Sequence, residues 1–176
     1  MTRAILAVVL VAAVAAVAAV VVFAGKWLAL VLALLAAWTA FVYATDRLKE
    51  VRLRRAFERE HGVAGRRLVI VYSRSPHWQE HIERHWLSRY GDRAVVLDWS
   101  DRSRWPRTGA PVAVEAFRRW GGAREFNPLV IAVPRHGSVR TVRFWRAFRD
   151  LKHGKDRTLR AAEAELERLA AEVSRP

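Results

Sequence analysis

The first 44 residues are almost entirely apolar, and this feature limits the chain more than any other. After Arg3, Lys26 is the only charged side chain in this segment. Two apolar stretches, residues 4–24 and 27–44, are separated only by Gly25 and Lys26. Each is close to the roughly 20 residues that a helix needs to cross the hydrocarbon core of a bilayer. With glycine at the break, the pattern predicts a transmembrane helical hairpin with a very tight turn.

A cleaved signal peptide is the alternative interpretation of the first stretch. The chain begins with a basic residue at position 3, and Val22, Phe23 and Ala24 resemble a cleavage site. However, the first stretch exceeds the ~7–15 residues of a signal-peptide core, and a second apolar stretch follows at once. The pattern therefore favours the hairpin, which anchors the chain in a lipid bilayer.

The rest of the chain is strongly basic. Residues 45–176 carry 29 Lys and Arg against 17 Asp and Glu, a net charge of +12. The segment 45–66 reads as a basic juxtamembrane helix followed by a joint. It contains five basic residues just after the second stretch: Arg47, Lys49, Arg52, Arg54 and Arg55. Basic residues beside a span favour the cytoplasmic side. We therefore expect a two-pass protein of a bacterial inner membrane, with both termini and the soluble domain in the cytoplasm.

The same five basic side chains are candidate lipid contacts. A basic side chain close to a leaflet of anionic lipids gains about 1 kcal/mol from the surface potential. Alternatively, these charges serve only as the topology signal. Both interpretations are compatible, so anionic lipid headgroups are an expected partner.

Beyond the glycines of the joint, strand and helix patterns alternate, which predicts an α/β domain over residues 67–176. The expected strands are residues 68–72, 94–99, 128–133 and 139–145. The expected helices are residues 76–90, 112–120, 146–152 and 156–173. Alternation of strands and helices predicts parallel pairing early in the domain. The short turn at 134–138 predicts an antiparallel pair late in the domain.

Two local features accompany this order of elements. The junction "VYSRSPHWQEH" passes from a strand through a tight loop into a helix, with Arg74, Ser75, Pro76 and His77 in the loop. Asn127-Pro128 opens the third expected strand. Together they resemble the thioredoxin-like fold over about residues 67–173. In that family the loop carries Cys-x-x-Cys, and a cis-proline opens the third strand.

The resemblance implies a small mixed four-stranded sheet with flanking helices on both faces. It implies strand order 2-1-3-4, with strand 3 antiparallel to strand 1. It also places the 74–77 loop beside Pro128, with a cis bond after Asn127. Arg74, Ser75, His77 and Pro128 are therefore the candidate binding residues.

The chain contains no cysteine, which decides what such a domain can do. Thiol nucleophiles, thiolate metal ligands and dithiol exchange are all excluded. A thioredoxin-like domain in this chain is therefore expected to be redox-inactive and to need no cofactor. Binding is favoured over catalysis, although the sequence does not exclude an enzyme.

The segment "SPHWQEHIERHW" raises the question of a metal site. His77, Glu80 and His81 match the H-x-x-E-H pattern of one zinc-peptidase class. His77 and His81 share a helix face and are the candidate metal ligands. His85 lies about 12 Å along the axis from His77, so the three histidines cannot bind one ion. With no third ligand in view, we expect no metal.

We expect this segment to be an ordinary amphipathic helix instead. Ser75 would cap it, and Pro76 would occupy its first turn. The bulky apolar residues recur every four positions and should face the sheet: Trp78, Ile82 and Trp86. The three histidines should then lie along the solvent-exposed flank.

Two surface features are weaker candidates for anion binding. The N-terminus of the same helix offers free N–H groups with Arg74 adjacent, which suits an anion; Ser75 as a plain N-cap explains the same residues. The polar loop 100–111 holds Arg102, Arg104, Trp105 and Arg107, which suits nucleic acid or phospholipid. The chain has no nucleic-acid-binding motif, so a nucleic-acid partner is not expected.

The leading hypothesis from sequence is a membrane-anchored, redox-inactive thioredoxin-like domain at the cytoplasmic face. It would act by contact with anionic lipid or with an unidentified membrane or cytoplasmic protein. The alternatives are a membrane-bound enzyme or a polyanion-binding module that uses the helix end at Ser75 and His77.

Overall fold

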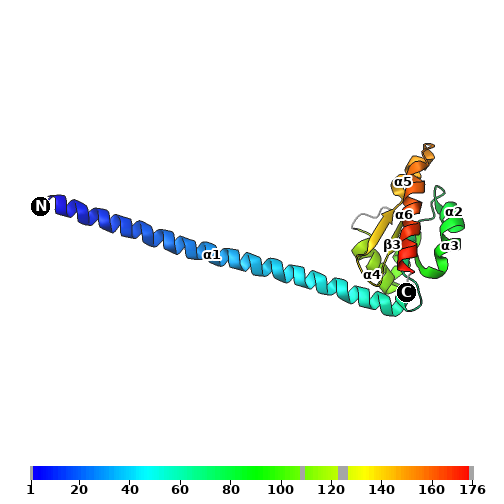
Figure 1. Ribbon diagram of the computed structural model, residues 1–176, viewed down its shortest axis with the longest axis horizontal. Helices are drawn as coiled ribbons and strands as arrows, with labels where there is room; N and C mark the ends of the chain where they lie inside the picture. Colours follow the sequence, from blue (N-terminus) through cyan, green and yellow to red (C-terminus); the bar gives the residue numbers. More distant parts are fainter. Residues whose placement is uncertain (1, 108–109, 123–126, 175–176) are drawn as a thin grey trace. The chain divides into compact units, whose positions relative to one another are not determined.

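The computed structural model (Figure 1) describes residues 2–107, 110–122 and 127–174. Side chains are not described for residues 2–13, 18–22, 24 and 106–107. The chain divides into two compact units, Met1–Lys49 and Glu50–Pro176. The first unit is a single helical segment, and the second contains the sheet and the remaining helices.

The apolar segment is one continuous helix, so the predicted hairpin is wrong. Helix α1 runs from Thr2 to Phe57 without a break, and Gly25 and Lys26 are both helical. A glycine inside a helix costs only about 1 kcal/mol relative to alanine. A reversal at this point would leave up to four C=O groups of the preceding helix and up to four N–H groups of the following helix without helical partners. With no proline present, continuation of the helix is the less costly outcome.

Within the described residues, one helix is long and apolar enough to cross a membrane, and it lies at Gly25–Gly62. Its most apolar window has a mean hydropathy of 2.1. A helix of this kind near the N-terminus is typical of both a membrane anchor and a signal sequence. A two-pass arrangement is therefore not shown.

The second unit contains a four-stranded sheet with the order β2-β1-β3-β4. The strands are β1 (Leu68–Tyr72), β2 (Ala94–Asp98), β3 (Leu129–Ala132) and β4 (Arg140–Arg143). β1 pairs in parallel with β2 and antiparallel with β3, and β3 pairs antiparallel with β4. The strand order and the reversed direction of β3 confirm the sequence prediction. The peptide bond between Asn127 and Pro128 is cis, as predicted.

Helices cover both faces of the sheet, and the central strand β1 supplies both cores. All five residues of β1 are buried, which is typical of a strand covered on both faces. Leu68, Ile70 and Tyr72 belong to one core, and Val69 and Val71 to the other. This alternation follows from the two-residue period of a strand.

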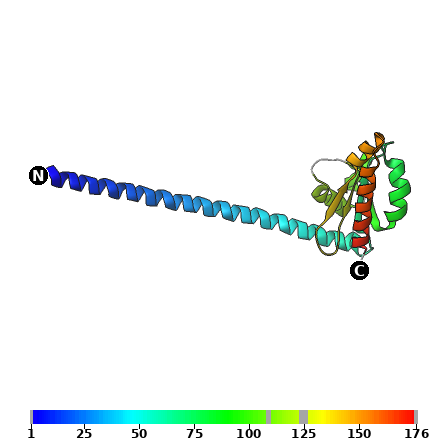
Figure 2. The same ribbon diagram turned by 45° about the horizontal axis from the view of Figure 1, so that its top comes forward.

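The first core lies under the helical segment 79–93 and the two C-terminal helices. That segment comprises α2 (Gln79–His81), the π-helical turn η2 (Ile82–Leu87), α3 (Ser88–Tyr90) and η3 (Gly91–Arg93). The C-terminal helices are α5 (Trp145–Lys152) and α6 (Arg157–Val173). In Figures 1 and 2, α6 (red) runs beside the green segment 79–93. The break at His153-Gly154 between α5 and α6 was predicted.

The second core lies under α4 (Pro111–Trp120), the 3-10 segment η4 (Trp99–Arg107) and the end of α1. Phe57 is fully buried there, and Leu53, one turn earlier, is 4 % exposed. Arg52, Arg55 and Arg59 are exposed and recur at three and four residues, so they share a face that these two apolar side chains do not occupy. The chain then passes through the π-helical turn η1 (Glu58–Gly62) into β1.

Two local predictions need correction. The helix expected at 76–90 begins only at Gln79, because residues 76–78 form a turn in which Ser75 O accepts from the N–H groups of Trp78 and Gln79. The expected polar loop 100–111 is largely the 3-10 segment η4. It is ordered by Trp105, which is 6 % exposed and packs against Trp99 and Phe117.

Candidate functional site

The structure brings the predicted binding residues to one end of the sheet. Val71 pairs with Leu129, so Pro128 lies at the end of β1 where the 73–78 loop begins. Pro128 is buried, whereas Arg74 and His77 are exposed. Ser75 Oγ lies 3.4 Å from the backbone nitrogen of His77, a long hydrogen bond. The predicted neighbourhood therefore exists, but its polar groups do not converge on a described cavity.

The positive charge of Arg74 is already compensated in this loop. Its guanidinium lies 2.7 Å from Asp98 Oδ2 and also pairs with Asp101. These two carboxylates, Asp101 first, raise the pKa of Arg74 above its ordinary value. The backbone nitrogen of Arg74 donates to Ser100 Oγ at 2.9 Å. Arg74 therefore fastens the loop to the end of β2 and leaves little positive field for an anion.

Tyr72, at the same end of the sheet, is held by the helical segment opposite. Its hydroxyl donates to Glu83 Oε1 at 3.3 Å, and Gln79 donates to the same oxygen at 3.0 Å. Burial, followed by the nearby Glu83 carboxylate, raises the pKa of Tyr72 to about 12. The phenol therefore stays protonated at neutral pH and acts as a structural donor.

The histidine-bearing segment is amphipathic, as predicted, with one exception. Ile82 and Trp86 are buried, and Trp78 is half-buried against the same core. His77 and His85 are exposed. His81 is only half-exposed, because its Nε2 lies 2.7 Å from Glu163 Oε1 on α6. No group of three or more His, Cys, Asp or Glu suited to a metal occurs among the described residues.

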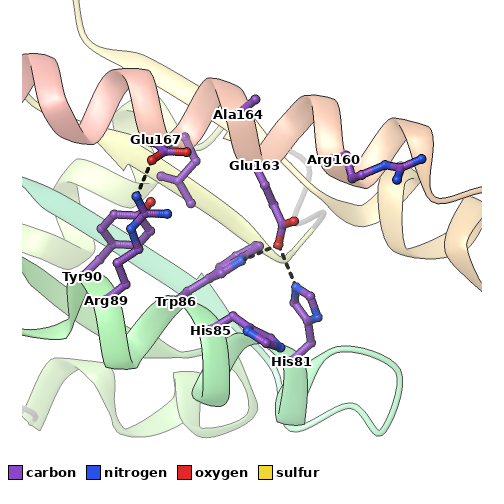
Figure 3. A pocket seen from close by; sticks show the side chains of 10 residues that line it. His81, His85, Trp86, Arg89, Tyr90, Arg160, Glu163, Ala164 and Glu167 are labelled. Atoms are coloured by element: carbon purple, nitrogen blue, oxygen red, sulfur yellow. Dashed lines mark hydrogen bonds and ion pairs between the residues drawn. The ribbon is translucent and has the colours of Figure 1, made fainter.

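A groove of about 500 Å³ separates this segment from α6 (Figure 3). Glu163 accepts from His81 and, at 3.0 Å, from the indole nitrogen of Trp86. Farther along, Arg89 pairs with Glu167. The groove is lined by His81, His85, Trp86, Arg89, Tyr90, Arg160, Glu163, Ala164, Leu166 and Glu167. Its two arginines are matched by its two glutamates, so the groove offers no net field for a charged ligand.

The predicted lipid-contact residues fall in both units of the chain. In the first unit, Arg47 and Lys49 are exposed, and Arg47 donates to the hydroxyl of Tyr43 at 3.0 Å. In the second unit, Arg52 and Arg55 are exposed. Arg54 differs, because its Nη2 donates to the carbonyl of Gly137 at 2.7 Å, and its Nε lies 3.7 Å from Glu50 Oε1. Arg54 therefore fastens the end of α1 to the β3–β4 turn.

Two cavities open beside the end of α1, and three of the described lining residues of each are arginines. The larger, about 410 Å³, is lined by Arg54, Arg55, Glu58, Val133, Pro134, Arg135 and His136. The smaller, about 270 Å³, is lined by residues 62–65, Arg67, Arg93, Arg135, Val173 and Ser174. Arg135 borders both cavities. Of the described residues that line these two cavities, Glu58 is the only acidic one.

Arg67 is the residue of this region that sequence reasoning missed. Its side chain is 5 % exposed, and its Nη2 lies 2.5 Å from Glu58 Oε1. A side-chain carbon at Gly62 would collide with the Glu58 carboxylate, so glycine there leaves room for the pair. An arginine just before an apolar strand reads as a surface residue, and only its neighbours reveal its burial.

The arginine-rich segment 99–107 does not present its aromatic residue for binding. The indole nitrogen of Trp105 donates to the carbonyl of Asp98 at 3.0 Å, and the ring is buried. Arg102 stacks over Trp99, with its guanidinium carbon 5.1 Å from the ring centroid. Trp105 is therefore a core residue rather than a platform for nucleic-acid bases.

No protein-family model, curated protein or solved structure matches this chain. Among the chain's own features, the concentration of exposed arginines around the end of α1 indicates a function most directly.

Proposed function

We propose that this chain is a membrane-anchored protein of a bacterial inner membrane whose soluble unit is a redox-inactive, thioredoxin-like binding domain. It acts at the cytoplasmic face by contact with anionic lipid headgroups, and a protein partner shares or extends this contact. The α1 helix supplies the anchor, as a single span rather than a hairpin.

The thioredoxin-like assignment is supported by three features. The first is the sheet order with β3 antiparallel to β1. The second is the placement of segment 79–93 and α6 on one face and α4 on the other. The third is Pro128, which follows a cis bond at the end of the sheet where the 73–78 loop begins. The absence of cysteine excludes the family's dithiol exchange, which favours binding over redox chemistry for this domain.

Lipid contact is supported above all by the basic face at the end of α1. Arg52, Arg55 and Arg59 are exposed on one side of the helix and have no ion pair with a described residue. They begin eight residues after the apolar stretch that ends at position 44. Each basic side chain near an anionic leaflet contributes about 1 kcal/mol. Three together give a preference of roughly 3 kcal/mol for anionic over zwitterionic headgroups.

The test uses the full chain reconstituted in vesicles of phosphatidylcholine that contain a trace of dansyl-labelled lipid. Energy transfer from the tryptophans to dansyl-phosphatidylglycerol should exceed transfer to dansyl-phosphatidylcholine, because the basic face enriches anionic lipid around the protein. The difference should shrink as salt screens the charges, since the Debye length falls from ~10 Å at 0.1 M to ~3 Å at 1 M.

A triple variant, Arg52→Gln, Arg55→Gln and Arg59→Gln, should lose most of this difference. The matched control removes three exposed arginines elsewhere in the second unit: Arg118→Gln, Arg140→Gln and Arg157→Gln. Equal losses in the two triple variants would mean that net charge alone attracts the lipid. Equal transfer to both labelled lipids in the unaltered protein would refute the proposed contact.

A further inference from the structure

A buried arginine, Arg67, lines the smaller cavity beside η1. Only one of its two terminal nitrogens has a hydrogen-bond partner among the described residues. Arg67 uses Nη2 for its pair with Glu58, at 2.5 Å. Its Nη1 is buried and has no hydrogen-bond partner within the described part of the chain. A buried charged donor without an acceptor carries its full desolvation cost. Arg67 lines the smaller cavity, so its positive charge adds to the basic character of that surface.

Two more arginines line the same cavity, and neither pairs with a carboxylate of the described part of the chain. Arg93 donates to Ser174 Oγ at 3.0 Å and to the carbonyl of Arg89 at 3.3 Å, both neutral acceptors. Arg135 is exposed and makes no ion pair with a described residue. Among the described residues that line this cavity, none is acidic. Glu58 pairs with Arg67, and no described carboxylate pairs with Arg93 or Arg135, so both add positive charge to the lining of the cavity.

The cavity is a pocket of a size that suits a small anion. Its volume is about 270 Å³, roughly twenty times the volume that a single water requires. Residues 62–65 form part of its lining, and Gly65 has φ 75°, a conformation that glycine adopts without strain. Guanidinium groups bind phosphate oxygens through paired, charge-assisted hydrogen bonds. Three of them around one pocket favour a phosphate group, whose tetrahedral oxygens can accept from more than one guanidinium.

We propose that Arg67, Arg93 and Arg135 form a binding site for a phosphate group, and that the phosphate belongs to an anionic lipid headgroup. The headgroup assignment rests on the proposed function, since the site borders the turn into which the anchoring helix α1 continues. Arg135 also lines the larger cavity with Arg54 and Arg55. That cavity gives the remainder of a headgroup a second basic surface to contact.

The first arm of the test measures inorganic phosphate with the full chain in a zwitterionic detergent. Phosphate should raise the unfolding temperature in a saturable manner, relative to chloride at equal ionic strength, because a ligand of the folded state stabilises it. Arg135→Gln and Arg93→Gln should each weaken the phosphate affinity about tenfold, the effect of losing one charge-assisted hydrogen bond. Arg118→Gln, an exposed arginine of α4, should bind phosphate like the unaltered protein.

The second arm distinguishes a lipid headgroup from free phosphate. The full chain is placed in nanodiscs of phosphatidylcholine, with and without phosphatidic acid or phosphatidylglycerol. The anionic lipid should raise the unfolding temperature, and added phosphate should then have little further effect because the site is occupied. A phosphate response that persists unchanged in anionic nanodiscs would overturn the headgroup assignment and identify free phosphate as the ligand.

The remaining outcomes separate this site from the wider lipid contact. Absence of a saturable phosphate response would overturn the site. It would not affect the lipid contact of Arg52, Arg55 and Arg59, which the energy-transfer experiment tests independently. Equal lipid stabilisation in the unaltered protein and in Arg135→Gln would also overturn the site and leave the general contact intact. Tighter binding of a single-stranded oligonucleotide than of either lipid would assign the pocket to nucleic acid instead.

Discussion

His81 and Glu163, which are 82 residues apart in the chain, meet across the groove between segment 79–93 and α6 with 2.7 Å between Nε2 and Oε1. The same carboxylate oxygen accepts from the indole nitrogen of Trp86, whose ring is 2 % exposed. Glu163 is thus the acceptor that satisfies a buried donor and holds one of the flanking histidines. The pair connects the two helical layers that cover the first core.

We predict that Glu163→Leu destabilises the soluble unit by about 1–3 kcal/mol, because it leaves the Trp86 N–H buried without an acceptor. Glu163→Gln should cost less, since the amide oxygen still accepts. Unfolding of the full chain in detergent, followed by near-UV circular dichroism in a denaturant series, measures both changes. Glu172→Leu, at an exposed position of the same helix, should change stability by less than about 0.5 kcal/mol. A similar small effect of Glu163→Leu would contradict the structural role.

The stability of the second unit should fall in mildly acidic solution through His61. Burial lowers the pKa of His61 below its ordinary value of 6.5. Its Nε2 lies 3.1 Å from Glu60 Oε1 without an aligned hydrogen bond. The unfolded chain therefore binds a proton on this ring more readily than the folded chain, and stability rises with pH. The stability gained because His61 is neutral is fully present above pH 6.5. It is lost as the pH falls from 6.5 toward the pKa of His61 in the folded chain.

The measurement is the free energy of unfolding between pH 5 and 8 in the full chain and in His61→Phe. The variant removes the titrating ring and keeps an aromatic contact with Phe57, whose ring centroid lies 5.1 Å from that of His61. Its stability should fall less steeply below pH 6.5, with the difference in slope under about 1.4 kcal/mol per pH unit. His136→Gln, an exposed histidine, should follow the unaltered profile. If the stability of His61→Phe falls with pH as steeply as that of the unaltered protein, His61 is not the cause of the acid sensitivity.

A continuous α1 helix that spans the membrane once places the two termini on opposite sides. Since the basic segment after position 44 favours the cytoplasm, we predict that residue 2 is reached from outside. The chain has no cysteine, so Thr2→Cys can be labelled in intact cells without background. Ser138→Cys, in an exposed turn of the soluble unit, should react only after permeabilisation. Protection of both positions in intact cells would restore the two-pass hairpin.

The thioredoxin-like proposal predicts that Arg74→Cys together with His77→Cys forms a disulfide. Arg74 precedes the turn in which Ser75 O accepts from Trp78 and Gln79, at 3.2 and 2.9 Å, and His77 lies within it. In the family the equivalent positions carry the redox cysteines. After air oxidation, both thiols should react with maleimide only once a reductant is added. Arg74→Cys with His85→Cys provides the control, and free thiols in both variants would argue against a family-like loop geometry.

Local apolar pattern accounts for the parts of this protein that could be predicted from sequence. The run "LVIVY" is apolar at every position, so a strand buried on both faces follows from the residues, whereas its central place in the sheet was implied by the family resemblance. The spacing of Trp78, Ile82 and Trp86 defined the buried side of segment 79–93. The absence of cysteine removed thiol chemistry without any structure. The short turn before β4 predicted its antiparallel pairing.

The tertiary structure decided which charged and aromatic side chains remain available to a ligand. Arg74, Arg67 and His81 each look like free surface groups in the sequence, yet each meets a carboxylate at least nine residues away: Asp98, Glu58 and Glu163, respectively. Trp105 sits among arginines in the chain but inside the second core in space. Local pattern cannot show these pairings, because burial depends on neighbours that only folding brings together. The course of α1 at Gly25 is also seen only in the structure, but for a local reason, since glycine permits both a turn and a continued helix.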